Sequence, residues 1–190
     1  MDDGRFVDPK IRFKNKPKTS CLLKDYFSVG SRGDLPFMMS SFCIKRETFL
    51  RLGGFPVGIA MGEDQDLFAR VALESDIAYT PEVLSFYHLD SSNRACQRLV
   101  PEEECSFSKR VLLAAEDVSI DADKRKDMLN YTAAHLLHIA SLNIRVGRLN
   151  VAKRLLSDKR CKMQPLRYFW WLANYSIRKF NSLRSVSISI

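Results

Sequence analysis

The chain has 190 residues, of which 46% are hydrophobic, enough for one ordinary domain with a buried core. It contains no run of about 18 uncharged apolar residues, which excludes a membrane-spanning helix. The acidic start at residues 1–5 lacks an apolar stretch, which excludes a secretory signal. The five cysteines are scattered without a C-x-x-C pair, which favours reduced thiols in the cytoplasm over disulfides or a zinc site.

The net charge of +8 is unevenly distributed along the chain. From Arg145 to the C-terminus there are 11 Lys and Arg residues and one acid, Asp158, whereas the first 144 residues carry about two negative charges. This basic segment indicates an anionic partner, such as the inner face of a membrane, or simply a solvated basic surface. No recognised reader motif accompanies the charge, so nucleic acid is not expected as a partner.

The first half of the chain predicts mixed elements. Residues 1–35 are polar and rich in proline and glycine, which predicts loops. The apolar and aromatic run at 37–44 predicts a buried strand. A brief helix is expected over 47–52, closed by Gly53 in the left-handed conformation.

Three further elements are expected before residue 95. Apolar spacing predicts a helix over 64–73, in which Asp66 and Arg70 are four residues apart and can form an ion pair. Two short strands are expected at 77–80 and 83–88. Together with the strand at 37–44, these elements predict an α/β fold for residues 1–95.

The second half predicts helices alone. Pro101 with three following glutamates indicates a helix start. Longer helices are expected over 121–146, 150–156 and 165–180, with residues 181–190 as a flexible tail. The last helix repeats apolar residues at helical spacing, which indicates either a buried face or a membrane-facing one. These residues are Leu166, Phe169, Trp170, Ala173, Ile177 and Phe180.

Several motifs occur in a fixed order between residues 36 and 95. They are Ser40-Ser41, Lys45-Arg46-Glu47, Gly53-Gly54-Phe55, Gly62-Glu63-Asp64-Gln65-Asp66-Leu67, Ile77-Ala78-Tyr79 and Tyr87-His88. This series resembles the second half of the catalytic domain of family 2 glycosyltransferases. The resemblance implies part of an A-type nucleotide-sugar (Rossmann-like) domain over residues 1–95, followed by an all-α region over 96–180.

The resemblance also implies roles for individual residues. Asp64 would be the general base that takes the proton from an acceptor hydroxyl, with the helix dipole keeping it ionised and lowering its basicity. Glu63 would orient the acceptor or its loop. Substrate-binding roles are implied for Gly53, Gly54, Ser41 and Asp66. His88 would bind a divalent metal, Mn²⁺ or Mg²⁺, that is expected only in a complete enzyme.

The resemblance implies transfer of a sugar from a nucleoside-diphosphate donor to a glycan or lipid-linked acceptor, as in polysaccharide biosynthesis. The enzyme would be cytoplasmic, or peripheral on the inner face of the membrane. No strand–helix series precedes residue 36, so the donor-binding half is missing, and the polypeptide alone is predicted to transfer no sugar.

Plainer alternatives stay open for the same residues. The acids at 63–66 would also serve as helix caps, and His88 as a half-buried structural side chain. The whole chain would then be a non-catalytic interaction module whose C-terminal helices dock a partner protein or a membrane.

Overall fold

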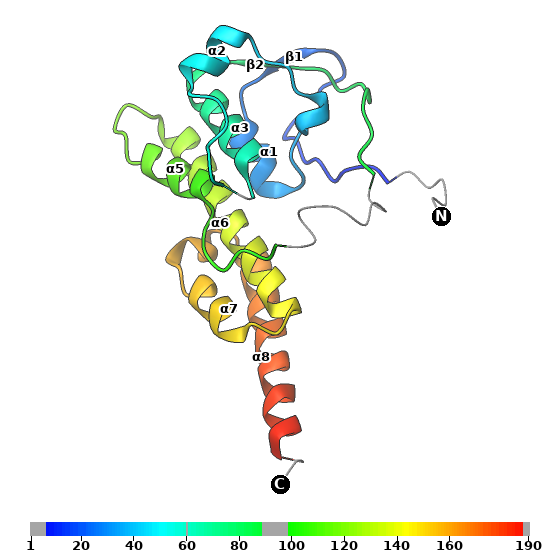
Figure 1. Cartoon of the computed structure of the whole chain (residues 1–190), viewed down its shortest axis with the longest axis vertical. Coiled ribbons are helices and arrows are strands. Elements are labelled where there is room, and N and C mark those ends of the chain that lie inside the picture. Colours follow the sequence, from blue (N-terminus) through cyan, green and yellow to red (C-terminus); the bar gives the residue numbers. More distant parts are fainter. Residues whose placement is uncertain (1–6, 60, 89–98, 188–190) are drawn as a thin grey trace.

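The computed structural model describes residues 7–59, 61–88 and 99–187. Within these ranges the chain forms seven α-helices and one pair of short strands (Figure 1). The helices are α1 (Tyr26–Arg32), α2 (Arg46–Arg51), α3 (Glu63–Glu74), α5 (Ser106–Ala114), α6 (Ala122–Arg145), α7 (Leu149–Leu156) and α8 (Pro165–Ser187). The strands are β1 (Cys21–Leu23) and β2 (Ile77–Tyr79), which pair antiparallel with Leu22 opposite Ala78.

Two buried clusters hold the helices together, and α6 runs through both. The first lies between α1, α3, α5 and the start of α6, and its largest fully buried side chains are Tyr26, Phe68, Phe107 and Leu67. The second lies between the end of α6, α7 and the base of α8. Because the first cluster contains residues from both sides of position 95, the two predicted domains share one core. The boundary itself stays a prediction.

The predicted α/β, Rossmann-like fold is wrong for the described residues, which are mainly helical with one two-stranded sheet. Residues 37–44 form no strand, but contain a 3-10 turn at Met39–Ser41. The rings of Phe37 and Phe42 stack with centroids 5.5 Å apart, and both contact Phe68. The apolar character of this run therefore serves aromatic packing rather than strand pairing.

The strand predicted at 83–88 is also absent from the described residues. Val83 and Leu84 are 72% and 73% exposed, so this segment has no buried face. A strand needs a neighbour to take its backbone hydrogen bonds, and no strand in the described ranges pairs with this segment. The predicted strand at 77–80 is confirmed as β2.

Residues 1–35 were expected to be loops, but within their described part they contain β1 and α1. Gly30, one of the glycines that favoured a loop, lies inside α1 where the helix meets α6. A Cβ at Gly30 would lie 2.8 Å from the Tyr131 ring. This glycine therefore allows a close approach between two helices and does not mark a turn.

The helices predicted in the second half are present with small shifts in their ends. The long helix α6 begins after Asp121, whose Oδ1 accepts the Lys124 N–H at 2.8 Å, and ends before Gly147 with φ of +80°. The helix start predicted at Pro101 is wrong, since α5 begins at Ser106. Helix α8 continues to Ser187 through most of the predicted tail, whose last residues lie outside the described ranges.

Helix α8 packs through the face opposite to its predicted apolar row. Tyr168, Trp171 and Tyr175 contact the second cluster, whereas Phe169 and Trp170 are each 64% exposed. Figure 1 shows that the second part of α8 extends beyond the rest of the molecule. No helix within the described residues is long and apolar enough to cross a membrane.

Candidate functional site

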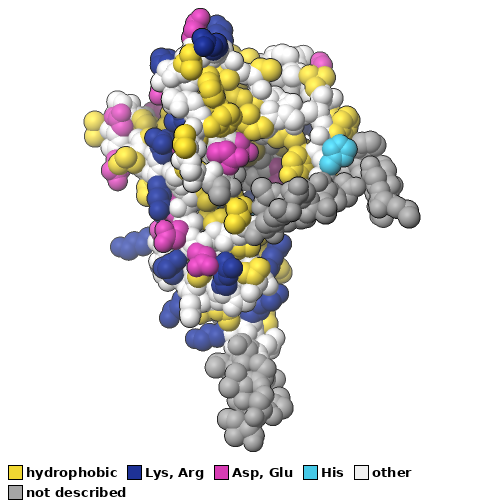
Figure 2. All heavy atoms as spheres, viewed as in Figure 1, with side chains coloured by type: hydrophobic (Ala, Val, Ile, Leu, Met, Phe, Trp, Pro, Cys, Tyr) yellow, Lys and Arg dark blue, Asp and Glu magenta, His cyan; other side chains and the backbone are white. Residues whose placement is uncertain are grey.

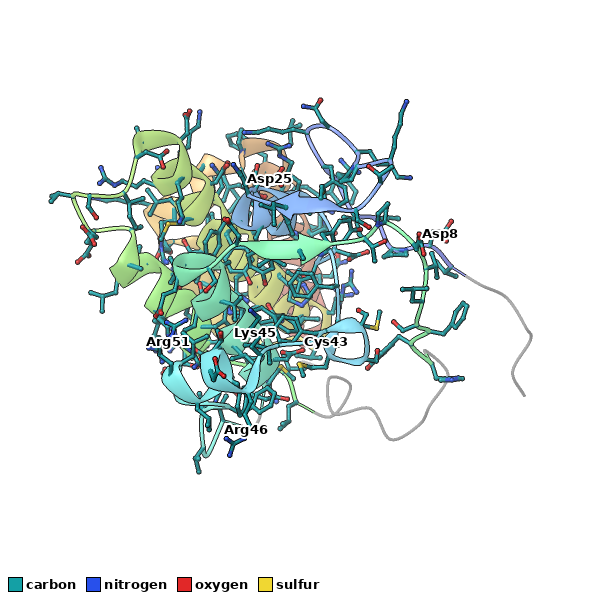
Figure 3. The ribbon with its side chains drawn as sticks, turned by 90° about the horizontal axis from the view of Figure 1, so that it is seen from above. Asp8, Asp25, Cys43, Lys45, Arg46 and Arg51 are labelled. Carbon is teal, nitrogen blue, oxygen red and sulfur yellow. The ribbon has the colours of Figure 1, made fainter. Side chains whose placement is uncertain are left out.

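The Gly53-Gly54 turn follows α2 and has a left-handed backbone at both glycines, with φ of +82° and +68°. The Gly54 N–H donates to the Phe49 carbonyl at 2.9 Å, which closes the end of α2. Residues with a Cβ rarely adopt this conformation, so the turn needs glycine at both positions. The left-handed conformation predicted for Gly53 is confirmed. Figure 3 shows Lys45, Arg46 and Arg51 around α2, beside this turn.

A buried ion-pair network joins the turn to α3. Asp66 has a side chain only 1% exposed, and its Oδ2 accepts the Nε–H of Arg70 at 2.8 Å, which confirms the predicted pair. Arg70 also donates to the carbonyls of Leu52 and Gly54, the latter at 2.6 Å. The second oxygen of Asp66 accepts the Nε–H of Arg110 from α5 at 3.0 Å. Asp66 therefore holds three segments together.

This network explains why two motifs ten residues apart in the sequence act as one structural unit. Because both oxygens of Asp66 are bound inside the protein, its geometry favours a structural role. The substrate-binding role predicted for Asp66 stays a prediction, and the geometry does not support it. The spacing predicted the pairing of Arg70 with Asp66, but not the hydrogen bonds of Arg70 to the Leu52 and Gly54 carbonyls.

The loop that enters α3 is fixed by Gly62. This glycine precedes the helix with φ of +83°, and it is buried against α5. A Cβ at Gly62 would lie 3.0 Å from the Phe107 ring. The close contact fixes the direction in which α3 starts, and with it the positions of Glu63 and Asp64.

Asp64 lies on the first turn of α3 and is half-buried. Its Oδ1 accepts the N–H of Gln65 at 2.6 Å, and no cation among the described residues pairs with it. Burial raises the pKa of Asp64, the Gln65 N–H opposes this, and the negative charge of Glu63 adds to it. The pKa of Asp64 is thus raised, mainly by burial, where a lowered basicity was expected from the helix dipole.

Two buried tyrosines lie near Asp64 in the interior. Tyr26 of α1 and Tyr131 of α6 are 2% and 3% exposed, and neither hydroxyl has a hydrogen-bond partner of acceptable geometry among the described residues. Burial raises the pKa of both, and the charge on Asp64 raises each further. No sequence pattern indicated this pair, since Tyr26 lay in an expected loop.

The other predicted site residues are exposed. Glu63 points to solvent beside Asp64. The Ser41 Oγ accepts the Met38 N–H and donates to its carbonyl, both at 3.1 Å, within the 3-10 turn. His88 lies at the exposed end of a described segment. Neither Ser41 nor His88 makes a hydrogen bond or ion pair with the residues described at the start of α3, so their roles stay predictions.

The metal prediction has no support from the described residues. Across residues 7–59, 61–88 and 99–187, no group of three or more His, Cys, Asp or Glu side chains is placed to hold an ion. Among the described residues, His88 therefore has no co-ligands of the kind that a bound Mn²⁺ or Mg²⁺ needs. The side chains present here do not fit the implied metal, and no chemical step is assigned to it.

An apolar cleft of about 330 Å³ lies next to the start of α3. Met61, three residues before Asp64, lines it together with Leu99 and Pro101. Ser106 also lines this cleft, and its buried Oγ has no hydrogen-bond partner among the described residues. The cleft offers hydrocarbon contact near a half-buried carboxylate.

The histidines of α6 do not belong to this site. The Nε2 of His135 accepts the Cys105 N–H at 3.2 Å, and its ring lies 4.4 Å from that of Phe107. Burial lowers the pKa of His135 to about 3, with the charges of His138 and Arg160 adding to the effect. His135 is therefore a neutral structural acceptor at the start of α5.

Comparisons with protein-family models, with curated protein sequences and with solved structures each gave no match. The resemblance to family 2 glycosyltransferases therefore depends on the motifs between residues 36 and 95.

Proposed function

We propose that this chain supplies the acceptor-side residues of a sugar-transfer reaction of the family 2 type, with Asp64 as general base. The observation that carries the proposal is the half-buried, unpaired carboxylate of Asp64, with its raised pKa, at the start of α3. A general base works best when its pKa lies nearer the working pH, and burial moves Asp64 in that direction. An acid that merely capped the helix would have no need of this environment.

The surroundings of Asp64 support the same chemistry. The Arg70 clamp holds the Gly53-Gly54 turn against α3, the helix that carries Asp64, and glycine backbone allows the close approach of a sugar. The apolar cleft beside Met61 favours a lipid-linked acceptor over a free glycan, because its walls would contact hydrocarbon. The donor, a nucleoside-diphosphate sugar, would be bound by groups outside these residues.

The test is a reconstitution assay with radiolabelled nucleotide sugars. The gene for this chain is deleted in its host cells. An extract of these cells is then supplemented with the purified chain or with a variant. With the wild-type chain, we expect sugar to be incorporated into lipid or glycan. With Asp64→Asn, we expect the incorporation to be about 100-fold lower. Glu116→Gln, which removes an exposed acid on another part of the surface, serves as the matched control.

Equal incorporation by wild type and Asp64→Asn would contradict the assigned base. Equal incorporation with and without the added chain would contradict the proposed function as a whole. Turnover by the purified chain without extract would contradict the prediction that it transfers no sugar alone.

A second role is favoured by α8. Its exposed row includes Leu166, Phe169, Trp170 and Ile177, with exposed fractions of 88%, 64%, 64% and 59%. Figure 2 shows Lys and Arg side chains over the lower part of the molecule, around α7 and the base of α8. An apolar row flanked by cations is typical of a helix that lies on an anionic membrane surface. We propose that α8 attaches the chain there.

The two tryptophans of the chain are neighbours in α8, which gives a direct test. In Trp171→Phe, Trp170 is the only tryptophan left, and it lies on the exposed row. Its emission is expected to shift to the blue with vesicles that contain anionic lipid, and to do so less at high salt. Unchanged emission with such vesicles would contradict membrane attachment.

A further inference from the structure

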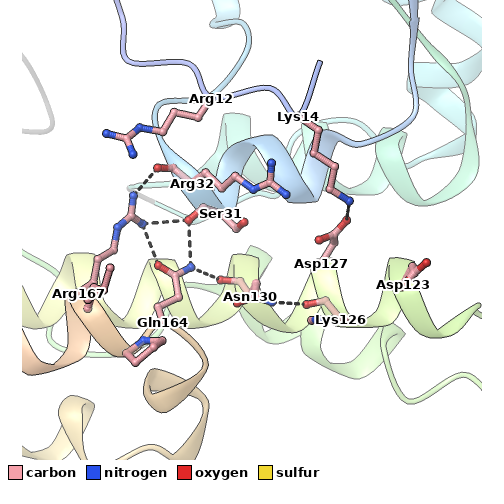
Figure 4. A pocket seen from close by; sticks show the side chains of 12 residues that line it. Arg12, Lys14, Ser31, Arg32, Asp123, Lys126, Asp127, Asn130, Gln164 and Arg167 are labelled. Carbon is pink, nitrogen blue, oxygen red and sulfur yellow. Dashed lines mark hydrogen bonds and ion pairs between the residues drawn. The ribbon is translucent and has the colours of Figure 1, made fainter. Parts of the chain in front are cut away.

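A cleft of about 520 Å³ separates the N-terminal segment and the end of α1 from α6 and the base of α8 (Figure 4). Cations outnumber acids along its walls. The cations are Arg12, Lys14, Arg32, Lys126 and Arg167, and the acids are Asp123 and Asp127. The excess of positive charge makes this cleft attractive to anions.

The charges within the cleft are separated rather than mixed. Figure 4 shows Asp123 and Asp127 at one end, and Arg12 and Arg167 at the other. The Asp127 Oδ2 lies 3.8 Å from the Lys14 Nζ, so the ammonium group partly neutralises this carboxylate. No carboxylate among the described residues pairs with either arginine at the opposite end.

Arg167 is held in position by backbone carbonyls at the end of α1. Its guanidinium donates to the Ser31 carbonyl at 3.0 Å and to the Arg32 carbonyl, and also to the Gln164 side-chain oxygen at 3.0 Å. The Gln164 amide in turn donates to the carbonyls of Ser31 and Asn130. These contacts fix the guanidinium before any ligand arrives.

Arg12 lies beside this fixed group and has no hydrogen-bond or ion-pair partner among the described residues. Burial, and then the like charge of Arg12, lower the pKa of Arg167. Two guanidinium groups side by side without a carboxylate repel each other, and an anion between them would relieve the repulsion. A neutral ligand would not relieve this repulsion.

We propose that the cleft binds a phosphate group between the guanidinium groups of Arg12 and Arg167. Guanidinium groups present paired N–H donors that match two oxygens of a phosphate. Arg32 and Lys126, farther along the walls, would extend the favourable field over a second phosphate. This site is distinct from Asp64 and does not depend on the proposed sugar transfer. The phosphate would belong either to a soluble compound or to a lipid headgroup, since the exposed side chain of Leu166 forms part of the cleft wall.

The first experiment measures binding of inorganic phosphate and pyrophosphate to the whole chain by calorimetry. Arg12→Gln removes a side chain without partners among the described residues, so folding is expected to be unchanged. Binding is expected to weaken about tenfold in this variant. Lys153→Gln removes one exposed positive charge on α7, outside the cleft, and is expected to leave binding within about twofold of wild type.

A second variant, Arg167→Lys, keeps the charge but loses the fork of donors. If the fork is required, its binding falls about as far as that of Arg12→Gln. Thermal unfolding of each variant separates loss of binding from loss of folding, because Arg167 also supports α1.

The second experiment identifies the source of the phosphate. Binding is measured to phosphatidylcholine vesicles with and without phosphatidic acid, in the presence and absence of pyrophosphate. Weaker vesicle binding by Arg12→Gln, together with competition by pyrophosphate, would assign the site to a lipid headgroup. Phosphate binding that Arg12→Gln weakens, without any change in vesicle binding, would assign it to a soluble phosphate compound. Equal effects of Arg12→Gln and Lys153→Gln in both experiments would overturn the proposal.

Discussion

The start of α3 and the segment leading into α8 both gather charged side chains, and in each place one charge is satisfied while a neighbour is not. At α3, Asp66 is bound by Arg70 and Arg110, whereas Asp64 has no cation. Before α8, Arg160 is bound by Glu104 and Asp158, each at 2.8 Å. Within α8, Arg167 donates to carbonyl and amide oxygens but pairs with no carboxylate among the described residues, and the neighbouring charge is the cation Arg12.

The paired groups, Asp66 and Arg160, connect distant segments of the chain. The groups without a partner of opposite charge, Asp64 and Arg12, are available to a reaction or a ligand. The two regions differ in how far water reaches the charge that is left. Asp64 is half-buried, so its protonation is shifted, which suits a base. Arg12 lines an open cleft, where its charge is screened but available, which suits an anion site.

The largest effect is expected from breaking the satisfied pair at α3. Asp66→Asn leaves Arg70 and Arg110 without their carboxylate, which is expected to lower the free energy of unfolding by about 3–5 kcal/mol. Glu74→Gln, which removes an exposed pair with Arg51, is expected to cost less than about 1 kcal/mol. Urea denaturation followed by circular dichroism measures both. Similar losses in the two variants would show that the buried network does not hold this region.

A smaller loss is expected when the entry to α3 is disturbed. In Gly62→Ala, the left-handed conformation is expected to lower the free energy of unfolding by about 1–2 kcal/mol. Crowding of the new Cβ against Phe107 adds to this loss, for a total of about 3 kcal/mol. Gly53→Ala has the same conformational cost, but a Cβ there would contact nothing within 4 Å. Thermal denaturation of the two variants should differ, and equal unfolding temperatures would remove Phe107 from the explanation.

Two variants near α8 compare a paired charge, Arg160, with an unpaired one, Arg12. Arg160→Gln leaves Glu104 and Asp158 without a cation in a partly buried site, which is expected to cost about 2 kcal/mol. Arg12→Gln is expected to change the free energy of unfolding by less than about 0.5 kcal/mol. Chemical denaturation gives both values, and a large loss in Arg12→Gln would assign Arg12 to the fold instead.

The last effect, also small, concerns Asp64 and depends on pH. Because its pKa is raised in the folded protein, the folded state holds this proton more tightly than the unfolded chain does. Stability is therefore lost as the pH rises from the ordinary pKa value of 3.8 through the raised one. Asp64→Asn should lack this loss and be more stable than wild type at pH 7, by less than about 1 kcal/mol. A difference that stays constant between pH 3 and 7 would contradict the shift.

The helices after residue 120 were largely predictable because local signals fix them. Asp121 caps α6, Gly147 ends it, and apolar spacing marks α7 and α8. Spacing could not show which side of α8 is buried. Its two faces both carry aromatic residues, and only contact with α6 and α7 selects Tyr168 and Trp171 for the interior.

The first half was less predictable because its short apolar runs are used in long-range contacts. Phe37 and Phe42 fit a strand pattern but pack on Phe68, and Gly30 fits a turn but lies against Tyr131. The Asp66–Arg70 pair was visible from its spacing. By contrast, the proximity of Asp64 to the buried tyrosines, and of Arg12 to Arg167, depends on the whole fold and has no local signal.

The contacts of Gln164 and Arg167 with the end of α1 also impose an order on folding. The carbonyls of Ser31 and Arg32 accept hydrogen bonds from side chains that lie 133 to 136 positions later in the chain. During synthesis these carbonyls can be bonded only by water until the base of α8 has been made. These carbonyls should therefore acquire their native hydrogen-bond partners late, after α6 has formed, as expected for contacts that close so long a loop.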